Sequence, residues 1–313
     1  MDYLRLGATL YVPGTHNDLD AIGNGYKIPN LRSLVFCTED SVSEKDLPSA
    51  MRNIGSSLEK LKHVDFMRFI RPRNPAVLME FLLMKGIAAI DGFVLPKVWL
   101  DNLPLYFKLL ELHRNFKVMI TLETKEVFNL NQLCRLRDTL VEKQYKNRIF
   151  TIRIGGLDLL NILGIRRACD RTIYDTPISH CINQVVTTFK PYGFNLSAPA
   201  YECFKNFKTL QKEIELDLLH GLVSKTAIHP SQIEIIQSAY KVSIHDLETA
   251  RTLIDPESPA IFRLYDRMCE KATHLNWAQG IVERANIYGV KQDIDHHDAM
   301  APHEAVVGGR CNG

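Results

Sequence analysis

The sequence predicts a single (β/α)8 barrel, an α/β fold of the TIM-barrel type, followed by a C-terminal helical appendage. Short apolar runs rich in β-branched residues alternate with longer segments of helical periodicity, which is typical of parallel strands joined by crossover helices. Eight such runs occur, and eight βα units are the number that closes this kind of barrel. The length of 313 residues accommodates one barrel and a small extension.

The predicted strands are spaced so that a helix fits between each pair. The fourth, fifth and sixth are almost continuously apolar, as strands covered on both faces must be. Polar residues gather where the strands end. The eight predicted strands occupy residues 8–14, 31–40, 65–73, 92–98, 117–124, 148–156, 194–199 and 227–232.

The chain is expected to divide into three parts. Residues 1–242 carry the eight βα units and predict a barrel catalytic domain. Residues 243–291 show helical periodicity only, which predicts a helical appendage. Residues 292–313 lack apolar periodicity and predict a mobile tail.

Composition narrows the classes of partner. A net charge of +2 gives no reason to expect nucleic acid or an anionic membrane surface. The N-terminus lacks the apolar run of a signal peptide, and no stretch is long and apolar enough to span a bilayer, so a cytoplasmic location is expected. The 7 cysteines are scattered without a CxxC pair, which predicts free thiols in a reducing compartment.

Candidate functional side chains follow the predicted strands, at the end of the barrel where catalytic groups of such folds lie. Acidic and basic residues are concentrated there. They are Glu39 and Asp40 after the second strand, Arg71, Arg73 and Asn74 after the third, Lys97 after the fourth, Glu123 after the fifth, Asp158 after the sixth and His229 at the eighth.

Glu123 and Asp158 follow adjacent predicted strands, so their carboxylates are expected to converge on one oxygen-preferring cation such as Mg2+. The alternative is that each carboxylate caps the helix that follows it, which Asp and Glu do routinely. For either residue alone, a helix cap explains the position as well as a metal site does. Their placement at corresponding strand ends favours the metal site.

Arg71 and Arg73 lie where a guanidinium could grip a substrate carboxylate at two points. A salt bridge to Glu39 or Asp40 is the structural alternative and does not exclude a role in binding. Lysines near strand ends, Lys97 and Lys225 among them, are most often simply solvated. His229 fits an acid, a base or a structural hydrogen bond equally well.

Taken in order, the strand-end motifs resemble those of the citrate lyase beta-subunit family within the HpcH/HpaI aldolase superfamily. Seven pieces match in sequence order over most of the chain. They are Leu10 to Gly14 with the family's "FVPG", Glu39 to Val42 with "LEDAV", Arg71 to Asn74 with "RVN", Leu95 to Lys97 with "LPK", Glu123-Thr124 with "ETA", Gly155 to Gly164 with "GxxDLxxxLG", and Gly221 to Gln232 with "GxxGKxxIHPxQ".

This resemblance implies a set of roles. In the family, the glutamate of "ETA" and the aspartate of "GxxDL" hold Mg2+, which implies that Glu123 and Asp158 are metal ligands. The strand-three arginine, here Arg71 or Arg73, would bind the substrate's carboxylate or carbonyl oxygen. A carboxylate such as Glu39 or Asp40, or a metal-bound water, would transfer the proton. The resemblance assigns further motif residues to substrate binding: Pro13, Gly14, Asn74, Lys97 and His229.

The implied reaction is cleavage or formation of a carbon–carbon bond next to a carbonyl, often in an acyl-coenzyme A such as citryl- or malyl-CoA. The metal and the arginine would stabilise the enolate-like charge that develops. Family analogy also predicts a homo-oligomer. The expected partners are therefore a small carboxylate or an acyl-CoA and further copies of this chain.

Several positions depart from the family pattern. Cys37-Thr38 stands where Asp-Leu is usual, Lys125 replaces the alanine of "ETA", Leu157 replaces an acidic residue, and Ser197 replaces an aspartate. These changes resemble a divergent branch of C–C bond lyase-like proteins associated with tellurium-resistance gene clusters. Two further hypotheses follow: a non-catalytic metal- and ligand-binding subunit of a biosynthetic or stress-resistance complex, and an aldolase that acts on free oxo-acids without CoA.

Overall fold

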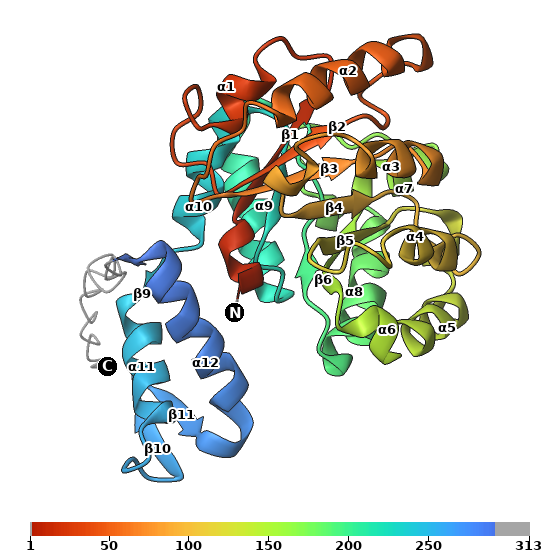
Figure 1. Ribbon diagram of the computed structural model, residues 1–313. Helices are drawn as coiled ribbons and strands as arrows, with labels where there is room; N and C mark the ends of the chain where they lie inside the picture. The colour runs from red at the N-terminus through yellow and green to blue at the C-terminus, as the bar shows by residue number, and fades with distance from the viewer. Residues whose placement is uncertain (1, 292–313) are drawn as a thin grey trace, which may run out of the picture. The chain divides into compact units, whose positions relative to one another are not determined.

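The computed structural model describes residues 2–291, and the part that ends at Tyr240 forms an eight-stranded parallel barrel (Figure 1). The strand order is β7-β6-β5-β4-β3-β2-β1-β8, and a parallel bridge between Ala198 and Lys225 brings the two outer strands together. The predicted barrel is confirmed. Its strands are β1 Ala8–Pro13, β2 Ser33–Cys37, β3 Met67–Arg71, β4 Gly92–Leu95, β5 Lys117–Leu122, β6 Ile149–Ile154, β7 Leu196–Ser197 and β8 Lys225–Ala227.

Apolar side chains from consecutive strands fill one level of the barrel interior. Val35, Phe69, Val94 and Met119, from β2 to β5, pack in one cluster with Leu6 and are fully buried. The strand ends beyond this level carry polar side chains instead. The barrel is therefore closed by packing at its centre and polar toward the C-terminal ends of its strands.

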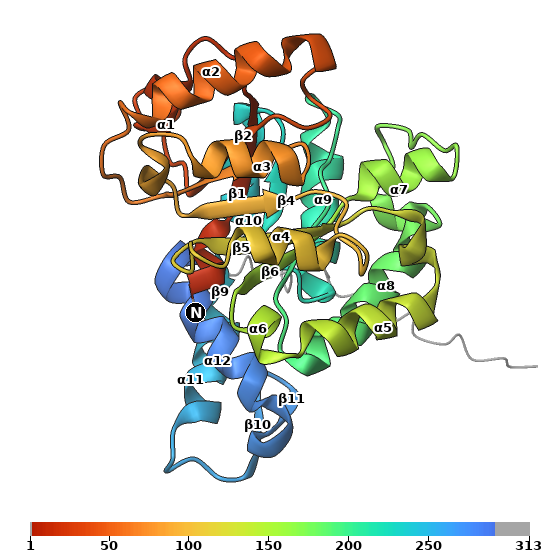
Figure 2. The ribbon, with the colours of Figure 1, turned by 45° about the vertical axis from the view of Figure 1, so that its right-hand side comes forward.

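The helices lie outside the strands, as Figures 1 and 2 show for α2 to α5 and α8. They are α1 Leu19–Gly23, α2 Leu47–Leu58, α3 Pro75–Leu82, α4 Leu103–Leu109, α5 Leu130–Leu140, α6 Lys143–Lys146, α7 Gly156–Ile162, α8 Ile178–Phe189, α9 Phe207–Leu219 and α10 Ile233–Ala239. Short 3-10 segments accompany them: η1 Asp2–Leu6, η2 Glu44–Asp46, η3 Ile87–Ala89, η4 Lys125–Phe128, η5 Ile173–Asp175, η6 Lys190–Tyr192 and η7 Pro230–Gln232.

The eighth strand begins and ends earlier than predicted. It pairs with Ala8 to Leu10 of β1 at Lys225–Ala227 instead of running through residues 227–232. His229 caps η7, and Pro230, which has no amide hydrogen to donate to a ladder, begins this segment. Lys225 therefore lies inside the barrel wall and is fully buried, so the expectation of a solvated lysine is wrong.

Residues 241–291 form a second compact unit. Two helices, α11 Ile244–Ile254 and α12 Lys271–Tyr288, lie side by side, with the parallel pair β9 Val242–Ser243 and β12 Val290–Lys291 (Figures 1 and 2). The expectation of helices only is wrong, because β10 Ile261–Leu264 and β11 Arg267–Glu270 form an antiparallel hairpin. The two-residue turn between them has positive φ at Tyr265 and Asp266.

Three further expectations concern the domain boundary, the C-terminal tail and membrane spans. The first unit ends at Tyr240, against a boundary predicted after residue 242. The segment 292–313, expected to be a mobile tail, lies outside the described residues. Among residues 2–291, no helix combines the length and the apolar character that crossing a bilayer requires.

Candidate active site

A cavity of about 470 Å³ lies at the C-terminal ends of the barrel strands. Its lining comes from several strands and the loops that follow them, including Pro13, Glu39, Arg71, Glu123 and Asp158. Parallel strands bring all their carboxyl ends to one rim, which explains why residues far apart in the sequence meet here. The structure therefore gathers both predicted metal ligands and one of the two predicted arginines at one cavity.

Arg71, the last residue of β3, is the centre of the charge arrangement. Its Nη2 donates to Glu123 at 2.8 Å and 3.0 Å and lies 3.0 Å from Glu39 Oε2. Its Nε is buried and has no hydrogen-bond partner in the described part of the chain. Burial alone would lower the pKa of Arg71, but the acidic groups around it, Glu123 first and Glu39 among them, together outweigh burial and raise the pKa. Arg71 is therefore positively charged, and its Nε–H is available as a hydrogen-bond donor.

Lys97 bridges three acidic side chains from an unusual backbone conformation. Its φ of 49° is in the left-handed region, which costs a non-glycine residue energy and persists where surrounding contacts hold it. The amide donates to Glu123 Oε1 at 2.8 Å, while Nζ lies 2.6 Å from Glu39 and 3.1 Å from Asp40. Burial alone would lower the pKa of Lys97, but its hydrogen bonds and ion pairs with Glu39 and Asp40 together have the larger effect and raise the pKa above its usual value. A permanently protonated amine does not suit Schiff-base chemistry.

The carboxylates of Glu123 and Asp158 are not helix caps. The residue before η4 is Thr124, and α7 has Gly155 at its N-cap without a side-chain cap bond. Asp158 makes no hydrogen bond or ion pair with its side chain inside the described range. Burial raises the pKa of both groups, and repulsion from Asp158 raises that of Glu123 further. The capping alternative therefore fails for both carboxylates.

This donor set fits Mg2+ in its chemistry. Magnesium takes oxygen ligands and is commonly held by one or two carboxylates, with water and substrate filling the other positions. Glu123 and Asp158 supply two such carboxylates, and within residues 2–291 no cluster of three His, Cys, Asp or Glu side chains suited to a metal exists. Gly155 makes room for Glu123, because a Cβ there would lie 2.3 Å from the Glu123 Cβ. Two carboxylates that repel each other across a cavity are the arrangement a cation would stabilise.

A family model described as C–C bond lyase of the TIM-barrel fold matches residues 1–290. The chain belongs to this family. Two curated relatives cover most of the chain. The (3S)-malyl-CoA thioesterase of Cereibacter sphaeroides is 22% identical over 298 residues, 95% of this chain and 96% of that protein. The mitochondrial citramalyl-CoA lyase of Rattus norvegicus is 25% identical over 270 residues, 80% of this chain and 76% of that protein.

Solved structures share the fold. A citrate lyase of Burkholderia xenovorans gives a TM-score of 0.71 at 16% identity, covering 94% of this chain and 96% of the other. CitE from Mycobacterium tuberculosis, in complex with magnesium, acetoacetate and coenzyme A, gives 0.65 at 18% identity, covering 90% and 99%. The predictions of a TIM barrel and of a carbon–carbon lyase are confirmed by the family model. The association with tellurium resistance, the cytoplasmic location and the homo-oligomer stay predictions.

The structure places the other predicted site residues away from the cavity lining, except Pro13 and Asp40. Arg73 Nε and Nη2 bond to backbone oxygens of Thr38, Glu39 and Val42, so this arginine fixes the loop after β2. The Asn74 side chain caps α3 by accepting from the amide of Val77.

Gly14 and His229 also have local structural roles. Gly14 is buried against α2, where a Cβ would lie 2.9 Å from Ile54 Cδ1. His229 is exposed, and its Nδ1 accepts from the amide of Ser231 while its ring lies beside Phe204. This geometry does not support direct substrate contact by Arg73, Asn74, Gly14 or His229.

Sequence reasoning missed the polar residues on the inward faces of the strands. Tyr11, Thr121, Arg153 and Thr226 all line the cavity. The available signal was Arg153, a charged residue inside an otherwise apolar predicted strand, since arginine is rarely fully buried without a reason. The cavity therefore has an acidic rim and a basic group below it.

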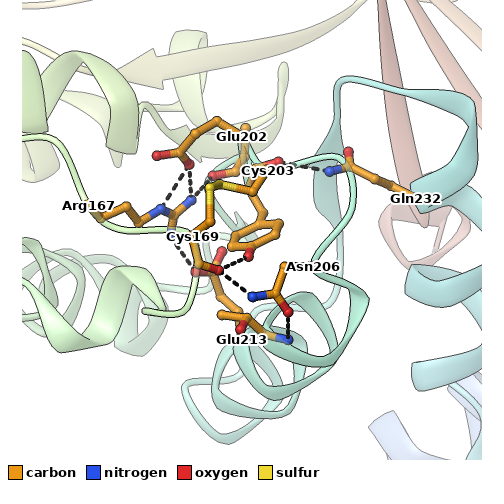
Figure 3. The surroundings of a disulfide bond; sticks show 10 residues. Arg167, Cys169, Glu202, Cys203, Asn206, Glu213 and Gln232 are labelled. Carbon is orange, nitrogen blue, oxygen red and sulfur yellow. Dashed lines mark hydrogen bonds and ion pairs between the residues drawn. A yellow bond between two sulfur atoms is a disulfide. The ribbon is translucent and has the colours of Figure 1, made fainter.

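A disulfide between Cys169 and Cys203, 34 residues apart, joins the loop after α7 to the loop after β7, which contributes Ala200 to the cavity lining (Figure 3). The expectation of free thiols is wrong for this pair, although the other described cysteines are free. Beside the disulfide, Arg167 donates to the Ala200 carbonyl at 2.8 Å and to Glu202 at 2.8 Å. Since Ala200 lines the cavity, this bond ties the wall to the loop that follows α7.

Proposed function

We propose that this C–C bond lyase holds Mg2+ between Glu123 and Asp158 and uses it to cleave or form a carbon–carbon bond next to a carbonyl of a carboxylated substrate. The observation that carries the proposal is the pair of carboxylates at one cavity, neither of which caps a helix, with Arg71 of β3 hydrogen-bonded to Glu123. When bound, Mg2+ would polarise the substrate carbonyl and stabilise the negative charge that develops on its oxygen.

The chain's own residues prepare the site. Arg71 and the Lys97 amide fix Glu123 by hydrogen bonds of 2.8 Å each, so this carboxylate is held in one orientation. Arg71 Nε, buried and without a partner among the described residues, can donate to a substrate oxygen. Arg71 thus positions a metal ligand and contacts the substrate.

Glu39 and Asp40 are distinguished by their bonding. Glu39 is buried and accepts from Lys97 Nζ at 2.6 Å and from the Asp40 amide at 2.8 Å, besides its contact with Arg71. Asp40 is exposed and lies 3.1 Å from Lys97 Nζ. We infer that Glu39 positions Arg71 and Lys97, and that Asp40 is the group that transfers the proton.

The names of the relatives support an acyl-CoA as the substrate class, since they are a malyl-CoA thioesterase and a citramalyl-CoA lyase. A screen of acyl-CoA thioesters and free oxo-acids, followed by mass spectrometry of the products, tests this choice. Cleavage of thioesters alone supports the proposal. Cleavage of free oxo-acids alone identifies a CoA-independent aldolase, and inactivity of the folded, Mg2+-loaded protein toward every compound favours a binding subunit.

The metal site is tested by calorimetric titration of Mg2+ in the presence of an oxo-acid. Wild-type protein should bind Mg2+, and Asp158→Asn should weaken binding by at least about 100-fold, because loss of a group that only orients a metal ligand already costs about 10–100-fold and Asp158 would be a direct ligand. Asp65→Asn is the matched control, since Asp65 is exposed and precedes β3 at the opposite end of the strand. Equal binding by wild type and Asp158→Asn would overturn the proposed site.

A further inference from the structure

Arg153 is a buried guanidinium on the inward face of β6. It is 2% exposed, lines the cavity, and pairs in register with Thr121 of β5. Thr121 lies two residues before Glu123, so this pair is one pleat, roughly 6–7 Å, deeper in the barrel than Glu123. The cavity therefore has a basic group below its acidic rim.

No carboxylate pairs with Arg153 in the described part of the chain. Its Nη2 donates to Thr226 Oγ1, its Nη1 lies 4.0 Å from the weakly accepting Met119 Sδ, and its guanidinium carbon lies 5.2 Å from the centre of the Tyr11 ring. Arg71, the other arginine in the lining, is held by both Glu39 and Glu123. Of the two, Arg153 is the one whose charge is not balanced by an acid.

The surroundings of Arg153 also contain an unused donor. Thr121 Oγ1 is buried and has no partner in residues 2–291, and it lines the same cavity as Arg153 and Thr226. Burial lowers the pKa of Arg153, as expected for a charge without a compensating acid. An unpaired charge and an unpaired hydroxyl in one buried pocket are each unfavourable, and a single anionic group of a ligand would satisfy both.

We propose that Arg153, Thr121 and Thr226 form a carboxylate-binding subsite, so that the lyase selects a substrate fragment with two anionic ends. One anionic end of the substrate fragment binds at Arg71, beside the carboxylates of the rim. The carboxylate at its other end binds deeper in the barrel, at Arg153. The planar fork of a guanidinium matches the two oxygens of a carboxylate. The inference rests on the proposed function for the upper end only, because the subsite itself is built from residues outside the proposed metal site.

A competing explanation is that Arg153 merely offsets the negative charge of the rim. The two explanations differ in which ligands they affect. A general charge balance would change the affinity for every anionic ligand and for Mg2+ alike. A subsite discriminates between two ligands that differ by one carboxylate, and pyruvate and oxaloacetate are such a pair.

The test compares the dissociation constants of pyruvate and oxaloacetate by calorimetry at low temperature, with Mg2+ present. Wild-type protein is expected to bind oxaloacetate at least 10-fold more tightly than pyruvate. In Arg153→Met this ratio should fall to near one, with Mg2+ and pyruvate binding unchanged within a factor of 3, while Arg153→Lys should retain part of it. A phosphonate analogue of oxaloacetate shows whether the subsite prefers a carboxylate to a phosphate-like group.

Thr121→Val is the second variant, which keeps the arginine and removes only the unpaired hydroxyl. It should lower the ratio 2- to 10-fold, and it covers the case in which Arg153→Met does not fold. A wild-type ratio near one, or equal ratios in wild type and both variants, would overturn the subsite. Failure of the proposed metal site appears differently, as binding that does not depend on Mg2+ or on Asp158, whereas the ratio and its loss in the variants would persist.

Discussion

The barrel contains two clusters of buried charge that differ in how completely they are paired. In the first cluster, Nζ of Lys225 on β8 lies 2.8 Å from both Glu213 and Asp217 on α9. Arg167 contacts Glu213 and Glu202. All these side chains except that of Glu202 are fully buried. We call this the closed network. At the cavity, in contrast, Asp158, Arg153 and Arg71 Nε keep unused donors or acceptors. The closed network supports the fold, and the open one can receive a ligand.

A shifted pKa alone does not distinguish these two clusters. Burial raises the pKa of Asp217 in the closed network to about 6, and it also raises the pKa of Asp158 at the cavity. The difference lies in the partners, because Asp217 accepts from both Lys225 and Tyr174 at 2.8 Å, whereas no donor reaches Asp158 in the described residues. Incomplete pairing beside a cavity is the better mark of a site than a shifted pKa.

Asp158→Asn should give the largest effect and act on the open cluster alone. Loss of a carboxylate ligand should reduce kcat/KM at least about 1000-fold, or roughly 4 kcal/mol of transition-state stabilisation. Because the side chain has no protein partner to lose, the free energy of unfolding should change by less than about 0.5 kcal/mol. Steady-state kinetics and urea denaturation measure the two quantities. A large loss of stability would show that Asp158 is structural after all.

Lys225→Met should give the opposite result. The substitution leaves Asp217 buried without a cation, while Glu213 keeps its contact with Arg167, and this should lower the free energy of unfolding by about 3–5 kcal/mol. Mg2+ affinity of the molecules that remain folded should be close to that of wild type. Arg153→Met is the matched control, since it also replaces a buried cation by methionine but removes no ion pair. Equal destabilisation by both substitutions would contradict the distinction between the two clusters.

The double variant Cys169→Ser, Cys203→Ser tests the crosslink that joins the loop of Arg167, in the closed network, to the loop of Ala200, in the cavity lining. A crosslink over 34 residues restricts the unfolded chain by up to about 3–4 kcal/mol, so its loss should lower the stability by a comparable or smaller amount. Since the linked loop contains Ala200, KM should rise while Mg2+ affinity stays unchanged. Denaturation with and without a reducing agent measures the first effect. A reductant that does not alter the wild type would argue against the disulfide.

The barrel could be predicted because its signal is repeated along the chain. Each βα unit has an apolar run and an amphipathic segment, so an error at one boundary, as at β8, leaves the topology intact. The hairpin β10–β11 had no such support. Its turn places Tyr265 and Asp266 at positive φ. Glycine or asparagine is usual at such positions and would have predicted a hairpin, whereas the pair Tyr-Asp does not.

Site residues near the ends of strands could be predicted from the sequence, whereas site residues within strands could not. Arg71 and Glu123 lie at or directly after the end of a strand, Glu39 and Asp158 follow within four residues of one, and the structure brings all four to one cavity. Which arginine faces inward depended on how the chain turns after β3, and Pro72 made the alternation of side chains uncertain. The disulfide joins two loops whose proximity is set by the closed barrel, and no local pattern reveals it.

Asn74→Ala is expected to give the smallest effect and separates motif membership from substrate contact. Asn74 accepts from the Val77 amide at 3.0 Å as the N-cap of α3, so its loss should lower the free energy of unfolding by about 1 kcal/mol. Asn74→Asp keeps the cap and serves as the control. If the exposed side chain does no more than cap, kcat and KM should match those of wild type in both variants. A rise in KM for Asn74→Ala that Asn74→Asp does not share would instead place this residue in contact with the substrate.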